Sequence, residues 1–341
     1  MTDGDLDDLS PRRPQRPRPA PARVSMAQVA ARAGVSGQTV SRVVNDSPRV
    51  DPATRERVER AMAELGYRPH RAARALRTGR SRTIGLVVTT LATVGNSRML
   101  QATAEAAAER GYALTLITAS GGVAAAFDRL AEQEVDGAIV LNEASAQVSA
   151  DARPAGLRLV VVDAPTSAGF TAVHSDHAGG AAAATTYLLK LGHPTVHHLA
   201  GPADSFAATE RERGWRETLA AAGVAAPAVV RGDWSAEAGH DAGAALAAAS
   251  AVFCANDQMA LGLLRALADD GRKVPEDVSV IGFDDVPDAA NYRPPLTTIR
   301  QDFTALADRA VEALVADIEG SVPTPGASVI PTSLIERAST R

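Results

Sequence analysis

The sequence predicts an α/β protein in two parts, a small all-α helix-turn-helix headpiece followed by a two-lobe core of doubly wound parallel sheets. Three short amphipathic helices are expected between residues 24 and 68, where apolar residues recur at helical spacing. From residue 81 onward, apolar runs alternate with amphipathic segments, which is typical of a parallel sheet covered on both faces. The alternation runs through twice, so we expect two lobes with a ligand-binding cleft between them.

Composition favours a soluble globular chain. Of its 341 residues, 45% are hydrophobic, and no apolar run approaches the roughly 18 residues that a membrane span needs. The N-terminus is acidic and rich in Pro and Arg, unlike an apolar signal region, so we expect a cytoplasmic protein without a membrane partner. The single cysteine, Cys254, has no ligand-type neighbours and is expected to be a buried small hydrophobe. We expect no metal and no cofactor.

Charge is distributed unevenly along the chain. Residues 1–82 contain 17 Arg, no Lys and nine acidic residues, which gives +8. The remaining residues contain 18 basic and 31 acidic side chains, which gives −13, and the two values sum to the net charge of −5. A basic head on an acidic body suits a protein that meets nucleic-acid phosphates with one end only.

Residues 1–23 should form a disordered tail, because they are rich in Pro, Arg and Asp and contain scarcely an apolar anchor. Two interpretations of this tail remain open. Either its five arginines add loose phosphate contacts, or the tail is solvated and has no role.

Residues 24–68 predict the headpiece. Ser25 can cap a first helix, and Gly34 should end it. Its apolar face is formed by Met26, Val29, Ala30 and Ala33. Ser36 can cap a second helix, whose inward side carries Val40, Val43 and Val44. Asp51 and Pro52 should begin a third helix, with Val58, Ala61, Met62 and Leu65 on its core stripe and Gly66 at its end.

The outer side of the second helix is polar without being acidic, as expected for a helix that enters the major groove of DNA. Gln can bond adenine and Arg can bond guanine. An ordinary helical hairpin is the structural alternative. The joint pattern A-x-x-A-G-V-S-x-x-T-V-S-R-V-x-N argues against that alternative, because it resembles the headpiece of the LacI/GalR family of bacterial transcription regulators.

The resemblance implies a transcriptional repressor that binds near-palindromic, double-stranded operator DNA as a homodimer. The DNA contacts that we expect are Ser36, Gln38, Thr39, Ser41, Arg42, Asn45, Ala73 and Leu76. Gly37 stands where an aromatic base-reading side chain is expected, so the operator sequence of a relative should not be carried over.

Residues 69–80 are Arg-rich and contain Leu76. In the family the corresponding segment is a hinge helix that forms on the operator, where its Leu wedges into the minor groove and kinks the duplex. A simple linker is the alternative interpretation, since an isolated helix of this length is marginally stable.

Residues 81–341 are expected to form the ligand-binding and dimerisation core, with the periplasmic-binding-protein-like fold that the resemblance implies. The first four strands are expected in TIGLVVTT, YALTLITA, GAIVLN and RLVVVD. The pattern then restarts with TAVHSD and continues through VHHLAG, AVFCAN and SVIGFD. We place lobe 1 at about 81–173 and 301–330, and lobe 2 at about 174–300 and 331–341, with about three crossings between them.

Polar residues follow the ends of several predicted strands. Asp163, Asn256, Asp257, Asp284 and Asp285 all occupy such positions, although Asn and Asp are also favoured as helix caps. The segments GDWSAEAG, ANDQMALG, IGFDD and PPLTTIRQDF resemble sugar-responsive members of the family. The resemblance implies ligand contacts from Asp163, Arg211, Trp234, Asn256, Asp284 and Phe303.

These residues suit a sugar, because carboxylates and amides bond hydroxyls and Trp234 offers an aromatic face to C–H groups. We therefore expect a galactoside-type inducer, with another sugar or a purine-like corepressor as the alternative. The other tryptophan, Trp215, is expected in the core. Departures from the family pattern at Leu141, His174, Ala207 and the Thr89–Met99 segment leave the identity of the sugar open.

An enzyme is the rival class. The sequence contains no GxxxxGK[ST], HExxH or GxSxG motif, and no GxGxxG follows the first strand. His193, His197 and His198 are close in sequence, but the last two occupy adjacent strand positions and should point to opposite faces. We therefore expect neither catalysis nor a metal site.

Overall fold

The computed structural model describes residues 24–45, 47–67, 79–142, 144, 148, 156–165, 170–321 and 327–341. The chain divides into two compact units, Met1–Gly79 and Arg80–Arg341, which we call the headpiece and the core. The predicted tail at 1–23 and most of the predicted hinge, including Ala73 and Leu76, lie outside the described residues.

Among its described residues, the headpiece contains three helices whose starts are fixed by side-chain caps. Their bounds are α1 Met26–Ala33, α2 Gly37–Val44 and α3 Pro52–Leu65. Ser25 and Gln28 form a reciprocal capping box on α1, while Ser36 and Asp51 accept backbone N–H bonds at the starts of α2 and α3. These caps satisfy amide groups that would otherwise have no partner at the helix ends.

The headpiece core lies where the three helices meet. Val29, Val40 and Val58 are fully buried there, and Tyr67 packs beside them. Met26, which was expected on the apolar face of α1, is 36% exposed and does not belong to this cluster. Met26 begins α1, one turn before Val29, so its side chain lies at the helix end rather than over the buried cluster.

The first lobe contains a six-stranded sheet in the order β11-β5-β4-β3-β1-β2, in which all paired strands are parallel. The strand bounds are β1 Thr83–Val88, β2 Ala113–Thr118, β3 Gly137–Leu141, β4 Arg158–Val162, β5 Thr171–Ser175 and β11 Ala327–Ile330. The helices of this lobe are α5 Val94–Glu109, α6 Val123–Glu132 and α11 Phe303–Glu319.

Both faces of this sheet are buried, as expected for a doubly wound sheet. Ile84, Leu86 and Val88 of β1 join a core cluster with α5 and α11. Val87, between Leu86 and Val88, instead joins a cluster with α6. Successive side chains of a strand point to opposite faces, so a continuous apolar run fills both cores.

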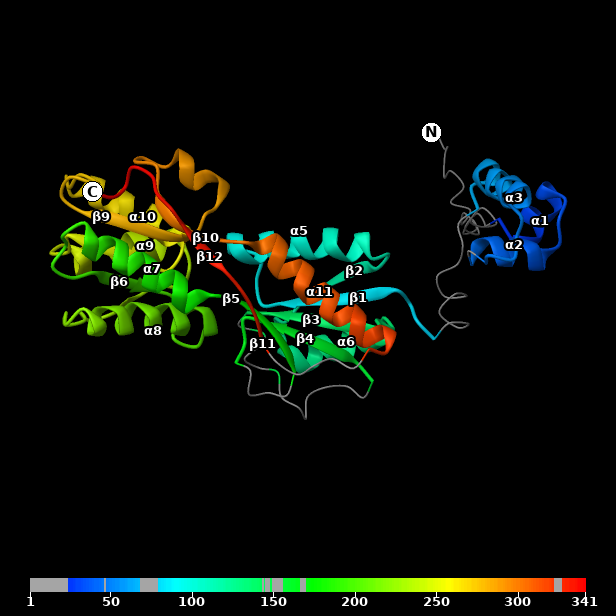
Figure 1. Ribbon diagram of the computed structural model, residues 1–341, viewed down its shortest axis with the longest axis horizontal. Helices are drawn as coiled ribbons and strands as arrows, with labels where there is room; N and C mark the ends of the chain where they lie inside the picture. The colour runs from blue at the N-terminus through cyan, green and yellow to red at the C-terminus, as the bar shows by residue number, and fades with distance from the viewer. Residues whose placement is uncertain are drawn as a thin grey trace, which may run out of the picture. The chain divides into compact units, whose positions relative to one another are not determined.

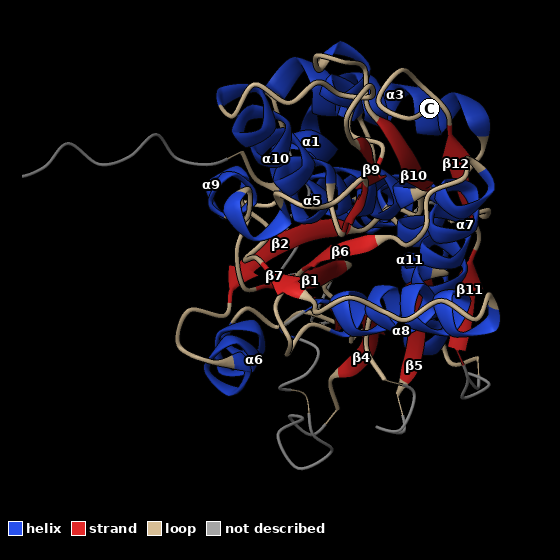
Figure 2. Ribbon diagram, turned by 90° about the vertical axis from the view of Figure 1, so that its left-hand side faces the viewer, coloured by secondary structure: helices blue, strands red, loops and turns tan. Residues whose placement is uncertain are grey.

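The second lobe repeats this plan in the order β12-β10-β9-β8-β6-β7. Figure 2 shows β9, β10 and β12 of this sheet side by side. Its strands are β6 His197–Ala200, β7 Val230–Arg231, β8 Ala251–Cys254, β9 Ser279–Asp284, β10 Thr297–Gln301 and β12 Thr332–Ile335. Its helices are α7 His177–Lys190, α8 Phe206–Ala221, α9 Ala236–Asp241 and α10 Asp257–Asp269, with short 3-10 helices at Ala244–Leu246 and Pro287–Asn291. Among the described strands of this sheet, only β12 pairs antiparallel, and its partner is β10.

The observed sheets differ from the predicted alternation in two ways. TAVHSD, expected to restart the pattern in the second half, forms β5 and pairs with β4 in the first sheet. The strands β7, β10, β11 and β12 and the helices α9 and α11 are additional to the elements read from the alternation. Sequence periodicity shows that a segment is a strand, but not which sheet will pair with it.

Three segments connect the lobes, and Figure 1 shows them running between the two sheets. They follow β5, β10 and β11, each of which continues into an element of the other lobe. The first and third are bonded together, because Asp176 N donates to Ile330 O at 2.8 Å and Thr332 Oγ1 donates to Asp176 O at 3.2 Å.

Two buried residues match their predicted roles. Trp215 is fully buried and its indole N–H donates to Val196 O at 2.9 Å. Cys254 is fully buried in β8, and burial raises the pKa of its thiol. None of the helices in the described part of the chain is long and apolar enough to cross a membrane.

Candidate functional site

In the headpiece, α2 presents a polar outer surface. Gln38 and Arg42 are exposed and Thr39 and Ser41 are half-buried, while Val40 and Val43 face the core. The remaining predicted DNA contacts in this region lie at the ends of the helix, Ser36 as its N-cap and Asn45 as its C-cap. The capped N-terminal end of α2 therefore presents adaptable hydrogen-bonding groups, which is what base-edge readout needs.

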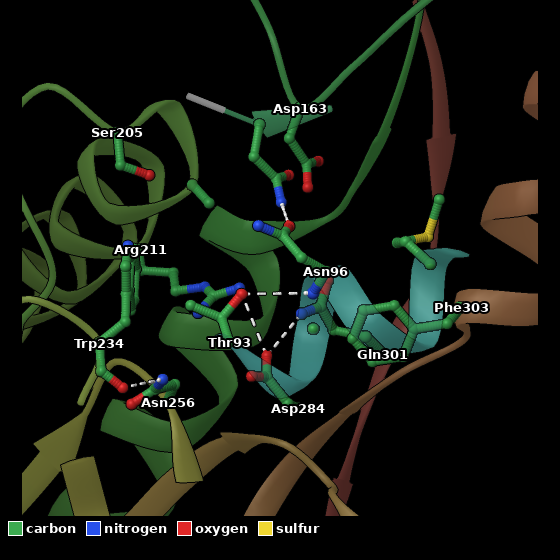
Figure 3. A pocket seen from close by; sticks show the side chains of 14 residues that line it. Thr93, Asn96, Asp163, Ser205, Arg211, Trp234, Asn256, Asp284, Gln301 and Phe303 are labelled. Carbon is green, nitrogen blue, oxygen red and sulfur yellow. Dashed lines mark hydrogen bonds and ion pairs between the residues drawn. The ribbon is translucent and has the colours of Figure 1, made fainter. Parts of the chain in front are cut away.

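In the core, one cavity lies between the two lobes at the carboxyl ends of their strands (Figure 3). Its volume is about 50 Å³, room for a few water molecules. A larger ligand would therefore need the lobes to separate or lining side chains to move. The lining residues are Thr93, Gly95, Asn96, Met99, Asn142, Asp163, Ser205, Ala207, Arg211, Trp234, Asn256, Asp284, Gln301 and Phe303.

All six residues predicted from sequence as ligand contacts line this cavity. Asp163 follows β4 in the first lobe, and Phe303 begins α11. The other four, Arg211, Trp234, Asn256 and Asp284, belong to the second lobe. The chain crosses between the two lobes beside the cavity, after β5, β10 and β11. Residues far apart in the sequence therefore converge on the cavity.

Four of the seven described non-glycine residues with positive φ line the cavity. Among the described residues, the lining positions Asn142, Asp163, Trp234 and Asp284 have φ of 48°, 52°, 76° and 112°. Residues other than glycine rarely adopt a positive φ. Such residues cluster at ligand sites, where the surrounding structure holds the side chain in one specific direction. Each of these four residues lies at or just beyond a strand end or in a loop, where the turn directs its side chain into the cleft.

Arg211 forms the centre of the cavity wall. It is 4% exposed, and its Nη1 donates to Ala255 O. Its guanidinium lies 3.8 Å from the centre of the Phe283 ring and 5.6 Å from that of Trp234. Its Nη2 also lies 3.6 Å from Asp284 Oδ1. A planar cation held in this way offers donors in a fixed direction.

Asp284 faces Arg211 and also accepts a 2.6 Å hydrogen bond from Gln301 Nε2 (Figure 3). Burial raises the pKa of Asp284, although Arg211 and Gln301 act in the opposite direction. The charge of this buried carboxyl is therefore costly unless hydrogen-bonding or charged partners compensate for it.

Asp163, on the opposite wall, behaves differently. Burial acts to raise its pKa, but His177, Arg211 and the Ser175 amide together outweigh burial and lower it. Ser175 N and His177 Nε2 both lie within hydrogen-bond distance of Asp163 Oδ1, at 3.3 and 2.9 Å. The two carboxyl groups of the cavity therefore differ: the charged form is favoured at Asp163 and disfavoured at Asp284.

Asn256 and Trp234 are fixed to each other. Asn256 Nδ2 donates to Trp234 O at 3.0 Å, while its Oδ1 accepts from Met259 N at 2.9 Å and so caps α10. The Trp234 ring packs against Gly201, where a Cβ atom would lie 2.3 Å from the ring. Asn256 is therefore a helix cap and a cavity residue at once.

The sequence analysis did not name five polar lining residues, although the first two lie in the Thr89–Met99 segment that it noted as a departure: Thr93, Asn96, Asn142, Ser205 and Gln301. It also placed a departure at Leu141, which is buried in the first core, whereas Asn142 lines the cavity and donates to Asn96 Oδ1. This one-residue error arises because strand β3 ends at Leu141 and the next residue turns left-handed. His174, another noted departure, contacts Phe206 and does not line the cavity.

The two other strand-end carboxylates are structural. Asp257 is buried beside Thr298 and Val286 N, and burial raises its pKa well above the usual value. Asp285 pairs with Arg300 at 2.7 Å and Arg337 at 2.6 Å. Burial opposes ionisation of Asp285, but these arginines lower its pKa overall.

The chemistry of the cavity suits a neutral, hydroxyl-rich molecule. It combines carboxylate and amide acceptors, guanidinium and amide donors, and aromatic faces from Trp234 and Phe303. Within the described residues, no three His, Cys, Asp or Glu side chains form a group that could hold a metal. His198 is fully buried with Nδ1 bonded to Phe253 O, while His197 is half-buried, as expected for opposite faces of β6.

Two family descriptions match the sequence. "Bacterial regulatory proteins, lacI family" matches residues 25–70, and "Periplasmic binding protein-like domain" matches residues 185–340. The lactose operon repressor of Escherichia coli K12 is 36% identical over 328 residues, which cover 93% of this chain and 91% of the relative. The repressor PurR of Vibrio campbellii is 35% identical, over 85% of this chain and 91% of the relative.

Solved structures show the same similarity. A crystal structure of the lac repressor dimer bound to operator and the anti-inducer ONPF matches with a TM-score of 0.84 at 34% identity, covering 94% of this chain and 99% of that one. A complex of the transcriptional regulator CelR with cellobiose matches with a TM-score of 0.70 at 34% identity, covering 93% and 100%.

Proposed function

The chain belongs to the lacI family of bacterial regulatory proteins, and we propose from this premise that it is a repressor whose operator binding is controlled by a sugar in the cleft. The headpiece reads DNA through the N-terminal part of α2, with Gln38 and Arg42 as base-reading side chains and Ser36, Thr39, Ser41 and Asn45 around them. The single observation that carries the DNA-reading role is the exposed polar surface of a capped second helix in a basic headpiece.

One headpiece reads too short a site for specificity, so the repressor acts as a homodimer on a near-palindromic operator. Light scattering of the purified protein tests this assembly, and a monomer or tetramer would contradict it. Leu76 of the hinge wedges into the minor groove between the two half-sites. The variant Leu76→Ala should then lose more affinity for operator than for random DNA, whereas equal losses would mean that the segment is only a linker.

The effector is a galactoside-type sugar that contacts Asp163, Arg211, Trp234, Asn256, Asp284 and Phe303. The convergence of these six side chains on one cavity, with acceptors on both walls and an aromatic ring beside them, is the observation that supports a sugar. A purine corepressor is the second candidate, because Trp234 would stack equally well on a base and PurR is among the relatives.

Release of the operator is the effect that we propose for the sugar. To move a two-state equilibrium from 1:99 to 99:1 takes roughly 5.5 kcal/mol of differential binding, so two sites in a dimer need roughly 3 kcal/mol each. A few buried hydrogen bonds that differ between the two states supply this amount.

A thermal-shift screen tests the effector class. Lactose, galactose, cellobiose, ribose and a purine base are added separately to the purified protein, and each compound that raises the Tm is then tested in an operator gel shift. A sugar that raises the Tm and weakens operator binding supports the proposal. A purine as the only stabilising compound, or a sugar that tightens operator binding, would replace the inducer with a corepressor.

A further inference from the structure

His177 is a buried ring beside the cavity that none of the roles above uses. It is the first residue of α7, directly after the first crossing between the lobes, and it is 2% exposed. The Phe283 ring lies 6.0 Å from it and the Phe206 ring 6.4 Å, centre to centre. Both of its ring nitrogens face charged partners.

The partners determine which nitrogen carries the proton. Arg211 Nε and Nη2 both lie 3.3 Å from His177 Nδ1, and a guanidinium can only donate hydrogen bonds. His177 Nδ1 must therefore present its lone pair. The hydrogen then resides on Nε2, which donates to Asp163 Oδ1 at 2.9 Å. The ring is held as the neutral Nε2–H tautomer.

This arrangement joins the two lobes through one ring. Asp163 follows the last residue of β4 in the first sheet, whereas Arg211 belongs to α8, which packs on the second sheet. The orientation of the imidazole depends on Asp163, and two donors of Arg211 depend on the imidazole. The guanidinium that lines the cavity is therefore oriented by a carboxylate of the opposite lobe.

We propose that His177 is a positioning residue that couples lobe closure to effector recognition. When Asp163 is in place, the ring holds Arg211 in the direction in which its donors serve the cleft, and when the lobes separate that support is lost. The regulatory role rests on the proposed function of the cleft, but the hydrogen-bond relay itself does not. A histidine that merely fills space beside Phe283 would not transmit the position of Asp163 to Arg211.

The relay can be tested without any ligand by NMR of the whole protein labelled with ¹⁵N. Comparison with His177→Gln assigns the His177 ring signals, and comparison with Arg211→Lys assigns the Arg211 Nε–H. The ring should show the Nε2–H tautomer, and Asp163→Ala should shift the Arg211 Nε–H resonance although the two residues belong to different lobes. A ring protonated on Nδ1, or an Arg211 signal unchanged by Asp163→Ala, would overturn the relay.

The coupling to recognition is tested with two neutral variants that separate the two bonds. In His177→Gln the amide reaches the place of Nε2 and can still donate to Asp163, but Arg211 loses the imidazole acceptor while its bond to Ala255 O remains. In His177→Asn the amide oxygen takes the place of Nδ1 and keeps that acceptor, but the link to Asp163 is lost. Calorimetric titration with lactose, or with cellobiose if lactose fails to bind, should show about tenfold weaker binding for His177→Gln.

In the absence of operator, His177→Asn should bind the effector almost as tightly as the wild type. Operator should weaken effector binding less in this variant than in the wild type, so the ratio of the affinities without and with operator should fall. A double-mutant cycle decides whether His177 acts through Arg211. In an Arg211→Lys background, His177→Gln should have no further effect on binding, whereas independent, additive losses would show a merely structural histidine.

The two hypotheses fail in different ways. If none of the sugars in the thermal-shift screen binds the wild-type protein, the proposed sugar effector fails, and the NMR result still decides the relay. If a sugar binds but the cycle is additive, the relay fails and the proposed function stands.

Discussion

The backbone amide of Val94 donates a 2.9 Å hydrogen bond to the side-chain oxygen of Gln258, tying the first turn of α5 in one lobe to the first turn of α10 in the other. Arg98, one turn further along α5, adds a second tie by donating to Asp285 O at 3.2 Å and lying 4.7 Å from the centre of the Phe303 ring. The arrangement of the lobes is thus stabilised at the cavity edge by two contacts in addition to those made by the lining carboxylates.

Replacing Gln258 by Ala removes the acceptor of the Val94 amide and should favour separation of the lobes. A net hydrogen bond contributes about 1 kcal/mol, so the ratio of closed to open forms should fall about fivefold. Hydrogen exchange measured by mass spectrometry should accelerate in the first turn of α5. Gln258→Glu is the matched control, because it keeps an oxygen acceptor and should leave that exchange rate near the wild-type value. Equal protection in all three proteins would show that the bond does not hold the lobes.

Removing Arg42 should reduce operator affinity by about 1 to 3 kcal/mol, the range for a bidentate contact with a base. Competition gel shifts with operator and random DNA measure the loss. Arg60→Ala on α3 removes the same charge from the headpiece, and its side chain pairs with Glu56 instead of lying on α2. Arg42→Ala should therefore lower the preference for operator over random DNA, and Arg60→Ala should leave it unchanged. A preference unchanged by Arg42→Ala would remove Arg42 from base readout.

Asp284→Asn should weaken effector binding about tenfold while leaving fold and operator affinity intact. Asn keeps an acceptor for Gln301, but it lacks the charge that faces Arg211 at 3.6 Å. The neighbouring variant Asp285→Asn is the control, since Asp285 does not line the cavity and pairs with Arg300 and Arg337. It should lower the Tm without altering effector affinity. Sugar titrations by calorimetry distinguish the two, and equal affinities for wild type and Asp284→Asn would contradict the assignment.

His198 should make the core less stable in mild acid. Burial lowers its pKa to about 4, from 6.5 in the unfolded chain, so the neutral ring is favoured in the folded state. The free energy of unfolding is therefore highest above pH 6.5 with respect to this group and falls as the pH drops toward 4. Over that range His198 is protonated in the unfolded chain but stays neutral in the folded chain. The loss should reach roughly 2 kcal/mol by about pH 5.

Urea unfolding of wild type and His198→Asn measures this pH dependence. The Asn amide can replace the Nδ1 bond to Phe253 O but cannot titrate, so the variant should lose the corresponding part of the acid dependence. Asp163 and Asp284 are present in both proteins, and their pKa values are shifted in opposite directions. The difference between the two pH profiles therefore reports the contribution of His198 alone. Parallel pH profiles would mean that His198 does not contribute.

The helices and central strands could be predicted from sequence because their determinants are local. Ser36 caps α2, Gly66 ends α3 in a left-handed conformation, and the apolar run of β1 fills two cores. The edge of the second sheet could not be predicted from sequence. Its strand β12 depends on pairing with β10, which lies more than thirty residues earlier in the chain.

The same distinction explains the cavity. Residues such as Asp163 and Asp284 were found because they follow apolar strands and match family motifs. Gln301 also ends a strand, but β10 was not among the strands read from the alternation. His177 had no signal in the sequence beyond a helix start, and its importance arises only when Asp163 and Arg211 converge on it.

The crossings between the lobes also constrain the order in which the ribosome can deliver a finished lobe. The face of the first sheet formed by Ile84, Leu86 and Val88 is covered partly by Leu306, Val311 and Leu314 of α11. That helix begins at Phe303, more than a hundred residues after β5, and follows the last central strand of the second lobe. Because the exit tunnel releases the chain from its N-terminus, the nascent first lobe exposes an apolar sheet face while most of the second lobe is still being synthesised. Chaperones that shield apolar surface should therefore bind this intermediate, and the lifetime of the intermediate should lengthen when translation is slowed between residues 176 and 302.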